Sequence, residues 1–274
     1  GPAVGLECAL LEARYPGCTV ASLGSDHYIG KAEEFCRLLQ VAEDALEAHP
    51  EFLFTIGIKP TRVETGYGHI RKGETLWQGA NEPVYAVEEF TEKPDAARAH
   101  AYTESGQYLW NSNMFVWKAQ TMLDLLEKFV PEIHERLVRI GNAVGTPEEV
   151  SVIEREYPEM PEIAIDNAVI ERAAEVATLE ADIGWSDIGS WAALPDVLET
   201  DEKGNLFSGE VLDIDAKGVT AFGIDGKLVA LVDVEDLVIV DTPDALLVCP
   251  RKSAQRVRDV VMALRGAKYQ GRYT

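Results

Sequence analysis

The chain has 274 residues, 46% of them hydrophobic, which is enough to bury a sizeable core in one large domain or in one large and one smaller domain. Its 47 acidic residues outnumber its 25 basic residues and give a formal net charge of −22, which repels nucleic acid and anionic membranes. No apolar run approaches the roughly 20 residues that cross a bilayer, so we expect a cytoplasmic protein without nucleic-acid or membrane partners.

The first two thirds of the chain alternate strand-like and helix-like patterns, which is typical of an α/β fold with a mainly parallel sheet. A loop rich in turn-forming residues spans residues 59–68. We predict strands over residues 19–23, 51–58, 84–90 and 108–117, and helices over residues 31–48, 95–105, 119–129, 131–140, 148–157 and 165–173.

After Asn205 the sequence pattern changes to short β-like segments. They are followed by a segment whose apolar residues have helical spacing. The β-like segments are residues 209–214, 219–224, 228–233 and 237–241, and the helical one is residues 253–265. We therefore expect a boundary near residues 201–205, with one domain over residues 1–204 and a β-rich domain over residues 205–274.

The four cysteines, Cys8, Cys18, Cys36 and Cys249, include no close pair. This spacing favours buried free thiols over a disulfide framework or a zinc site.

Two aspartates lie where apolar sequence gives way to small residues. Asp26 follows the predicted strand 19–23, and Asp187 lies inside the sequence GWSDIGSW over residues 184–191. Carboxylates placed in this way suit a hard cation such as Mg²⁺, which proteins bind through one or two carboxylates together with substrate phosphates. Taken alone, each aspartate fits a turn or a helix cap better than a metal site.

Several polar residues at predicted strand ends suit a sugar phosphate. Lys93 can neutralise a phosphate, and Glu92 can accept hydrogen bonds from hydroxyl groups. The glycines of Thr65-Gly66-Tyr67-Gly68 let backbone amides approach a ligand, and Asn111-Ser112 place an amide and a hydroxyl beside Trp110. The alternatives are a solvated ion pair, a plain turn and a tryptophan in the core.

Six sequence motifs, taken in order, resemble those of mannose-1-phosphate guanylyltransferases. They are GSDHYI at residues 24–29, PTRVETGYGHI at 60–70, FTEKP at 90–94, WNSNMF at 110–115, IDNAVIE at 165–171 and GWSDIGSW at 184–191. The resemblance is close up to about Trp191 and looser over the β-rich remainder.

The resemblance implies a Rossmann-like nucleotidyltransferase fold of the glycosyltransferase-A-like kind, an α/β fold with a mixed sheet and helices on both faces, followed by a small β-rich domain. It implies transfer of GMP from GTP to mannose 1-phosphate, which gives GDP-mannose and pyrophosphate. Asp26 and Asp187 would hold Mg²⁺, Lys93 would meet the sugar phosphate, and Gly66, Glu92 and Asn111 would contact mannose. One metal and one lysine are the local cations that an acidic protein needs to bind such anions.

The sequence also departs from this family's pattern. Members open with a strand and a glycine-rich loop that carries an arginine and a lysine, whereas residues 1–6 resemble the helix that follows that segment. We therefore expect the chain to begin within the nucleotide-binding region. In addition, Asn113 stands where glycine is usual, and His69 stands where another aromatic ring is common.

Two alternatives stay open beside the guanylyltransferase. One is a catalytically silent homologue that binds sugar nucleotides or has a regulatory role. The other is a related hexose-1-phosphate nucleotidyltransferase with another base or sugar, because the base is normally recognised by the family's opening segment. The β-rich part also suggests a possible role in a homodimer.

Overall fold

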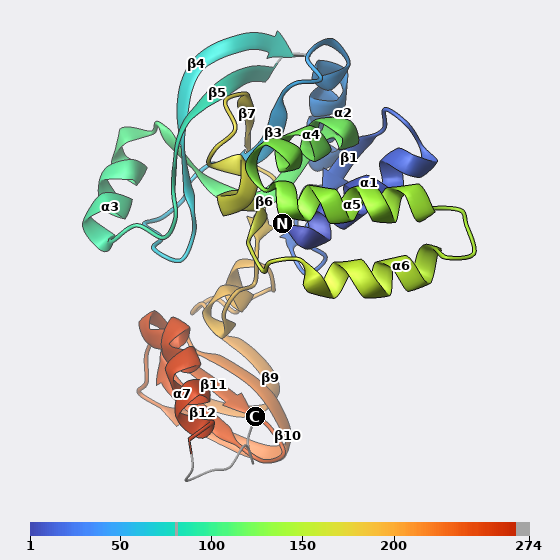
Figure 1. Cartoon of the computed structure of the whole chain (residues 1–274). Helices are drawn as coiled ribbons and strands as arrows, with labels where there is room; N and C mark the ends of the chain where they lie inside the picture. Colours follow the sequence, from blue (N-terminus) through green and yellow to red (C-terminus); the bar gives the residue numbers. More distant parts are fainter. Residues whose placement is uncertain (80–81, 267–274) are drawn as a thin grey trace. The chain divides into compact units, whose positions relative to one another are not determined.

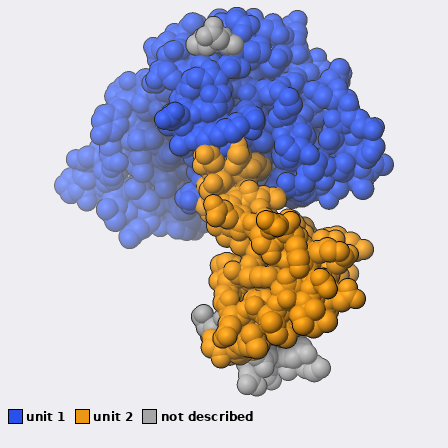
Figure 2. Space-filling view, turned by 180° about the vertical axis from the view of Figure 1, so that it is seen from behind, with its two compact units in different colours: residues 1–25, 31–183 blue, residues 26–30, 184–274 orange. Residues whose placement is uncertain are grey.

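The computed structural model describes residues 1–79 and 82–266. The described chain falls into two units (Figures 1 and 2). Unit 1 comprises Gly1–Ser25 and Lys31–Ile183, and unit 2 comprises Asp26–Gly30 and Gly184–Thr274. The short segment that carries Asp26 thus belongs with the C-terminal unit.

Unit 1 contains a six-stranded sheet in the order β1-β6-β3-β7-β5-β4. The strands are β1 (Thr19–Ser22), β3 (Leu53–Ile58), β4 (His69–Gly79), β5 (Glu82–Thr91), β6 (Tyr108–Lys118) and β7 (Val176–Ala181). Among these strands β3 and β7 run parallel, whereas the other neighbouring pairs run antiparallel. The start of β4 also pairs with β6.

The mixed sheet confirms the predicted fold class, but the expectation of a mainly parallel sheet was wrong. Strands β4 and β5 follow each other closely in the chain and pair antiparallel, as strands joined by a short connection must. Strands β4 and β7 were not predicted at all. They add antiparallel neighbours on both sides of β5.

Helices cover both faces of this sheet. Helices α1 (Pro2–Arg14), α4 (Ala119–Phe129) and α5 (Pro131–Ala143) pack against one another (Figure 1), and their apolar side chains share a core with Phe115 and Trp117 of β6. Successive strand residues face opposite sides, so Met114 and Val116 point to the other face. Helix α2 (Ala32–Ala48) contacts β6 and β7 and buries one apolar face.

The remaining helices of unit 1 are α3 (Ala96–Ser105) and α6 (Glu149–Glu156), with a short 3₁₀ turn η1 (Tyr157–Glu159). The side chain of Asp95 caps α3 by accepting a hydrogen bond from the Arg98 N–H at 2.9 Å. The helix predicted over residues 165–173 is a shorter π-helical turn, η2 (Asp166–Ile170). Such turns frequently lie at functional sites.

Unit 2 joins a small two-stranded sheet to a larger one. Strand β2 (Tyr28–Ile29) pairs antiparallel with β8 (Trp185–Ser186). The larger sheet has the order β12-β11-β10-β9, in which β9, β10 and β11 run parallel and β12 pairs antiparallel with β11. These strands are β9 (Leu206–Ile214), β10 (Thr220–Val232), β11 (Leu237–Asp241) and β12 (Leu246–Pro250).

The described residues of unit 2 also form three short helices, namely η3 (Trp191–Asp196), η4 (Arg251–Arg256) and α7 (Val257–Leu264). Two of the predicted β segments form the single strand β10, and the predicted last helix begins as the 3₁₀ turn η4. Asn205 is buried, and its side chain accepts from the Val219 N–H and donates to the Ala216 carbonyl. This asparagine ties successive parallel turns of the chain together.

All four cysteines are free, but the expectation that all are buried was wrong. Cys8 is buried, Cys18 and Cys249 are half-buried, and Cys36 is exposed on α2. Burial raises the pKa of the Cys8 thiol to about 12, so this thiol stays protonated and behaves as a small apolar side chain. Within residues 1–79 and 82–266, no helix is long and apolar enough to span a membrane.

Candidate active site

The ends of three strands of unit 1 bring predicted site residues together. His69 of β4 pairs with Thr91 of β5 and with Trp110 of β6. The next residue along each chain segment is Gly68, Glu92 or Asn111, so these residues meet at one edge of the sheet. The Asn111 N–H donates to the Gly68 carbonyl at 2.8 Å.

Gly68 is closely surrounded by the other two residues. A Cβ atom added to Gly68 would lie 2.7 Å from Glu92 Oε2 and 3.2 Å from Asn111 Cβ. The absence of a side chain at this position therefore allows the carboxylate and the amide to lie side by side.

The Asn111 side chain is held in place by hydrogen bonds at both ends. Its Nδ2 donates to Asp166 Oδ1 at 3.3 Å, and its Oδ1 accepts from the Asn113 N–H at 3.1 Å. Asn113 is exposed and has a left-handed backbone with φ of 57°. Glycine and asparagine are the residues that adopt this conformation most readily. Asparagine in place of glycine at position 113 therefore keeps the backbone geometry that orients Asn111.

Asp166 is a site residue that sequence reasoning missed, although its motif was recognised. It lies in the π-helical turn η2 and is half-buried. Burial raises the pKa of Asp166, and the negative charges of Glu92 and Glu171 raise it further, whereas the Asn111 hydrogen bond lowers it. The available sequence signal was an aspartate that directly follows the apolar Ile165 within the recognised IDN motif, because an acidic residue that becomes buried requires a polar partner.

Lys93 supplies a cation at this edge. Its Nζ donates to Glu92 Oε1 at 2.7 Å, and its side chain is 64% exposed. Lys93 also has a left-handed backbone with φ of 44°, which is unusual for a residue other than glycine. Strained backbone of this kind clusters at binding sites. The exposed ammonium is accessible to a phosphate.

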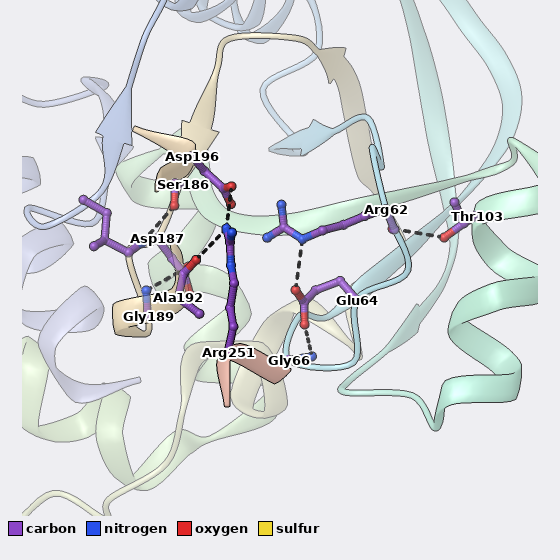
Figure 3. Close-up of polar contacts among 11 residues, drawn as sticks. Arg62, Glu64, Gly66, Thr103, Ser186, Asp187, Gly189, Ala192, Asp196 and Arg251 are labelled. Carbon is purple, nitrogen blue, oxygen red and sulfur yellow. Dashed lines mark hydrogen bonds and ion pairs between the residues drawn. The ribbon is translucent and has the colours of Figure 1, made fainter. Parts of the chain in front are cut away.

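The loop before β4 is organised by Glu64, a residue that sequence reasoning did not single out. Glu64 Oε1 accepts from the Gly66 N–H at 2.8 Å, and Oε2 lies 3.4 Å from Arg62 Nε (Figure 3). The Thr103 hydroxyl of α3 donates to the Arg62 carbonyl at 3.3 Å. Thr65 lies exposed at the tip of this loop.

A buried aromatic layer supports these polar residues. Trp110 and His69 are buried, and the rings of Tyr67 and Tyr102 pack against them respectively. The burial of Trp110 agrees with the alternative that it is a core residue. The His69 Nδ1 atom lies 3.1 Å from the Tyr67 carbonyl oxygen, and burial lowers the pKa of His69. His69 is therefore a neutral structural residue beneath the site.

Ser112 differs from the other predicted contacts. Its side chain is fully buried and its hydroxyl donates to the Ile56 carbonyl of β3. This bond lies where the pairing of β6 with β3 is irregular, between Asn111 and Phe115 of β6. In this structure Ser112 holds the two strands together.

The two predicted metal ligands, Asp26 and Asp187, both belong to unit 2. Tyr28 pairs with Ser186 in the antiparallel β2–β8 sheet, so the chain leads back to Asp26 and on to Asp187 from the same end of this sheet. Asp26 is exposed and Asp187 is half-buried. Two aspartates that lie next to the same end of a short sheet are suited to contribute ligands to a cation site.

The turn that carries Asp187 is locally constrained. Asp187 Oδ1 accepts from the Gly189 N–H at 3.1 Å, and Ser186 Oγ accepts from the Ile188 N–H at 3.1 Å (Figure 3). Ile188 has φ of 46°, a genuine outlier for a β-branched residue. The side chain of Asp187 is thus oriented by a strained turn.

The donor atoms at Asp26 and Asp187 fit a hard divalent cation. Both residues offer carboxylate oxygens, the ligands that Mg²⁺ prefers, and Mg²⁺ commonly uses one or two carboxylates together with substrate phosphates. No group of three or more histidine, cysteine, aspartate or glutamate side chains gathers as a metal site in the part of the chain that the structure describes. A two-carboxylate site completed by phosphate oxygens is compatible with that finding.

Comparison with known proteins defines the class. Residues 2–204 match the family model described as nucleotidyl transferase, and the chain belongs to this family. Residues 209–264 match the model described as MannoseP isomerase/GMP-like beta-helix domain. That match agrees with the successive parallel turns of β9, β10 and β11.

The similar curated proteins are about twice as long as this chain. The chain is 39% identical over 246 residues to the xanthan biosynthesis protein XanB of Xanthomonas campestris pv. campestris (strain B100), covering 89% of this chain and 50% of that protein. It is 41% identical over 245 residues to a mannose-1-phosphate guanylyltransferase of Klebsiella pneumoniae, covering 89% and 51%. The chain therefore spans about half the length of the curated relatives it matches.

A solved structure is similar over nearly the whole chain. It is named mannose-1-phosphate geranyltransferase from Thermus thermophilus, and it aligns with a TM-score of 0.79 and 32% identity. The alignment covers 96% of this chain and 75% of that one.

Proposed function

We propose that the protein transfers GMP from GTP to mannose 1-phosphate and so forms GDP-mannose and pyrophosphate. The observation that carries this proposal is the convergence of Gly68, Glu92 and Asn111 beside Lys93 at one sheet edge. The names of several relatives, among them the guanylyltransferases of Klebsiella pneumoniae and Escherichia coli, support the substrates.

In this proposal the polar edge of unit 1 binds the sugar phosphate. Glu92 accepts hydrogen bonds from mannose hydroxyls, Asn111 donates or accepts through its amide, and Gly66 and Gly68 let the ligand approach the backbone. The ammonium of Lys93 meets the phosphate. We assign Ser112 a structural role, because its hydroxyl is buried and already bonded.

Asp26 and Asp187 would hold Mg²⁺ in the proposed reaction. When bound, the cation neutralises charge on the phosphates. The strained turn at Ile188 fixes the direction of the Asp187 carboxylate, so little reorganisation is needed on binding.

The proposed chemistry is an in-line attack by a phosphate oxygen of mannose 1-phosphate on the α-phosphorus of GTP, with pyrophosphate leaving. The nucleophile is already anionic, so no general base is required. Catalysis then rests on alignment and on neutralisation of charge, to which Lys93 contributes on the sugar phosphate.

Binding measurements by calorimetry test the sugar site. We expect mannose 1-phosphate to bind, and Asn111→Ala to weaken that binding about tenfold, the effect of losing roughly one hydrogen bond. Lys93→Met should remove the preference for mannose 1-phosphate over mannose. The matched controls Asn142→Ala and Lys128→Met, on helices α5 and α4, should bind like the wild type.

Several outcomes of the same titrations would reject the sugar site. Wild-type affinity in Asn111→Ala would show that Asn111 does not contact the sugar. An unchanged phosphate preference in Lys93→Met would show that Lys93 does not contact the phosphate. No binding by the wild-type chain would reject the site as a whole.

We also propose that the protein forms a homodimer through the outer face of β9 and β10. Leu212, Ile214, Leu228 and Val232 are each at least 50% exposed there. Val232 pairs with Ile214, so these side chains form a contiguous apolar surface. A second copy presents the same surface, which makes a twofold contact self-complementary.

A further inference from the structure

Arg251 links the C-terminal strands of unit 2 to the segment that follows Asp187. The residue begins η4 directly after β12, and its Nη2 donates to the Ala192 carbonyl at 3.1 Å (Figure 3). The same nitrogen lies 3.8 Å from Asp196 Oδ1. The Arg251 N–H donates to the Asp236 carbonyl at 2.7 Å, which fixes the base of the side chain.

The hydrogen-bond acceptor and the ion-pair partner of the Arg251 side chain both lie in η3, the 3₁₀ helix that starts four residues after Asp187. A second contact holds the same helix, because the Trp191 ring packs at 5.6 Å from the Phe222 ring of β10. Ala193, which lies between these two contacts along the chain, is buried. The helix is therefore fixed to the β-rich part of unit 2 at both ends.

The turn between Asp187 and η3 needs such an anchor. Ile188 has an unfavourable left-handed backbone with φ of 46°, and the contacts of its turn include hydrogen bonds to the side chains of Ser186 and Asp187. A strained backbone persists only where the surrounding structure constrains it. The guanidinium supplies a charge-assisted hydrogen bond to that surrounding structure.

We propose that Arg251 is a positioning residue for Asp187. By holding η3 in place, Arg251 preserves the strained turn and with it the direction of the Asp187 carboxylate. The inference rests on the proposed function, because it takes Asp187 as a ligand of the divalent cation. It gives the C-terminal β-rich part a role in the metal site.

The test measures Mn²⁺ binding by electron paramagnetic resonance, together with hydrogen exchange of residues 185–196 in the metal-free protein. Arg251→Met keeps the apolar stem and removes the guanidinium. We expect it to weaken Mn²⁺ binding by up to about tenfold, the lower end of the effect of outer ligand-supporting residues. Exchange in this segment should accelerate, while the midpoint of global unfolding changes little.

Three comparison variants make the result specific. Arg251→Lys keeps a cationic donor for the Ala192 carbonyl, so it should restore most of the affinity and the protection. Arg256→Met removes an exposed arginine from the same helix and should behave like the wild type. Asp187→Asn should lose most Mn²⁺ binding, because it removes a proposed ligand itself.

The outcomes separate this inference from the proposed function. If Asp187→Asn loses Mn²⁺ but Arg251→Met binds it like the wild type, the positioning role is wrong and the metal site stands. If Asp187→Asn still binds Mn²⁺ normally, the metal site itself is wrong. Asp196→Asn, in which the arginine remains, provides a second test should Arg251→Met not fold. It should weaken binding in the same direction as Arg251→Met but by less, and wild-type affinity would overturn the inference.

Discussion

At the scale of single residues, Asn113 shows how backbone conformation orients the side chain of Asn111, which we propose contacts the sugar. Its left-handed φ of 57° turns its N–H toward Asn111 Oδ1. Asn113 itself is exposed, so its own side chain contributes little packing. The backbone conformation, more than the amide group, is the property required here.

Replacing Asn113 with glycine and with alanine should therefore have different effects on the free energy of unfolding. We expect Asn113→Gly to keep the free energy of unfolding within about 0.5 kcal/mol of the wild type and to retain sugar binding. Asn113→Ala should cost about 1 kcal/mol, because alanine resists the left-handed region. Denaturant unfolding measures both, and equal stabilities would show that the conformation is not constraining.

His69 makes stability depend on pH. Burial lowers its pKa below the ordinary value of 6.5, so the unfolded chain binds a proton more tightly than the folded chain. The stabilising effect of the neutral ring is present above pH 6.5 and is lost as pH falls from there toward the lowered pKa. His69→Phe keeps a ring against Tyr102 and removes this titration.

The test measures the denaturation midpoints of the wild type and the variants at pH 7.5 and at pH 5.5. The drop between them should be smaller in His69→Phe than in the wild type, whereas the exposed-site control His100→Gln should keep the wild-type drop. An equal drop in His69→Phe and the wild type would count against a buried neutral His69.

Gly68, Glu92, Lys93 and Asn111 of the proposed sugar site could be singled out from the sequence, because Glu92 and Lys93 follow a predicted strand and all four residues lie in the recognised motifs. Asp166 and Glu64 could not be singled out from the sequence. Their roles depend on hydrogen bonds to Asn111 and Gly66, and the first of these joins residues 55 positions apart. Sequence spacing alone does not reveal contacts of that range.

At the scale of elements, Gly57 shows how closely β3 and β6 pack. A Cβ atom at Gly57 would lie 2.5 Å from Leu109 Cδ1 and 2.8 Å from Thr178 Oγ1. Gly57 also pairs with Asn111 at the irregular part of the sheet. A larger residue at this position would push apart the strands that position the site.

Gly57→Ala and Gly141→Ala should therefore have opposite effects. Overpacking should make Gly57→Ala about 1–3 kcal/mol less stable. Gly141 lies within α5, and the nearest atom to an added Cβ is 4.0 Å away, so alanine there should add about 0.5–1 kcal/mol. Thermal or denaturant unfolding tests both, and a stable Gly57→Ala would contradict the packing described.

Two strands of the six-stranded sheet in unit 1 escaped prediction for physical reasons. Strand β4 has an irregular register with β5 and contains Lys72, Gly73 and Glu74, which break the alternation of apolar and polar residues. Strand β7 is nearly all buried and contains Ala177 and Ala181, so a short apolar run there does not distinguish strand from helix. The long amphipathic helices, in contrast, matched their predicted ranges closely.

At the scale of the whole molecule, the predicted fold class was right because helical and strand periodicities change along the chain. The division into units was harder to foresee. Residues 26–30 belong with the C-terminal unit through the two-residue strand β2, which is too short to leave a periodic signal. The boundary expected near residues 201–205 stays a prediction.

The proposed dimer is tested by light scattering coupled to size-exclusion chromatography. We expect a mass of twice the 30.1 kDa chain for the wild type. Val232→Glu places a charge in the exposed apolar surface of β9 and β10 and should give the monomer mass. Val150→Glu, the same substitution at an exposed position of α6, should remain dimeric. A dimeric Val232→Glu would place the contact elsewhere.

The most direct measurement of the central claim is pyrophosphate release from GTP in the presence of mannose 1-phosphate and Mg²⁺. The account predicts release that depends on mannose 1-phosphate and that falls by about a hundredfold or more in Asp187→Ala, while the surface control Asp124→Ala retains it. Unchanged release in Asp187→Ala, or no release by the wild-type protein, would contradict the proposed transfer.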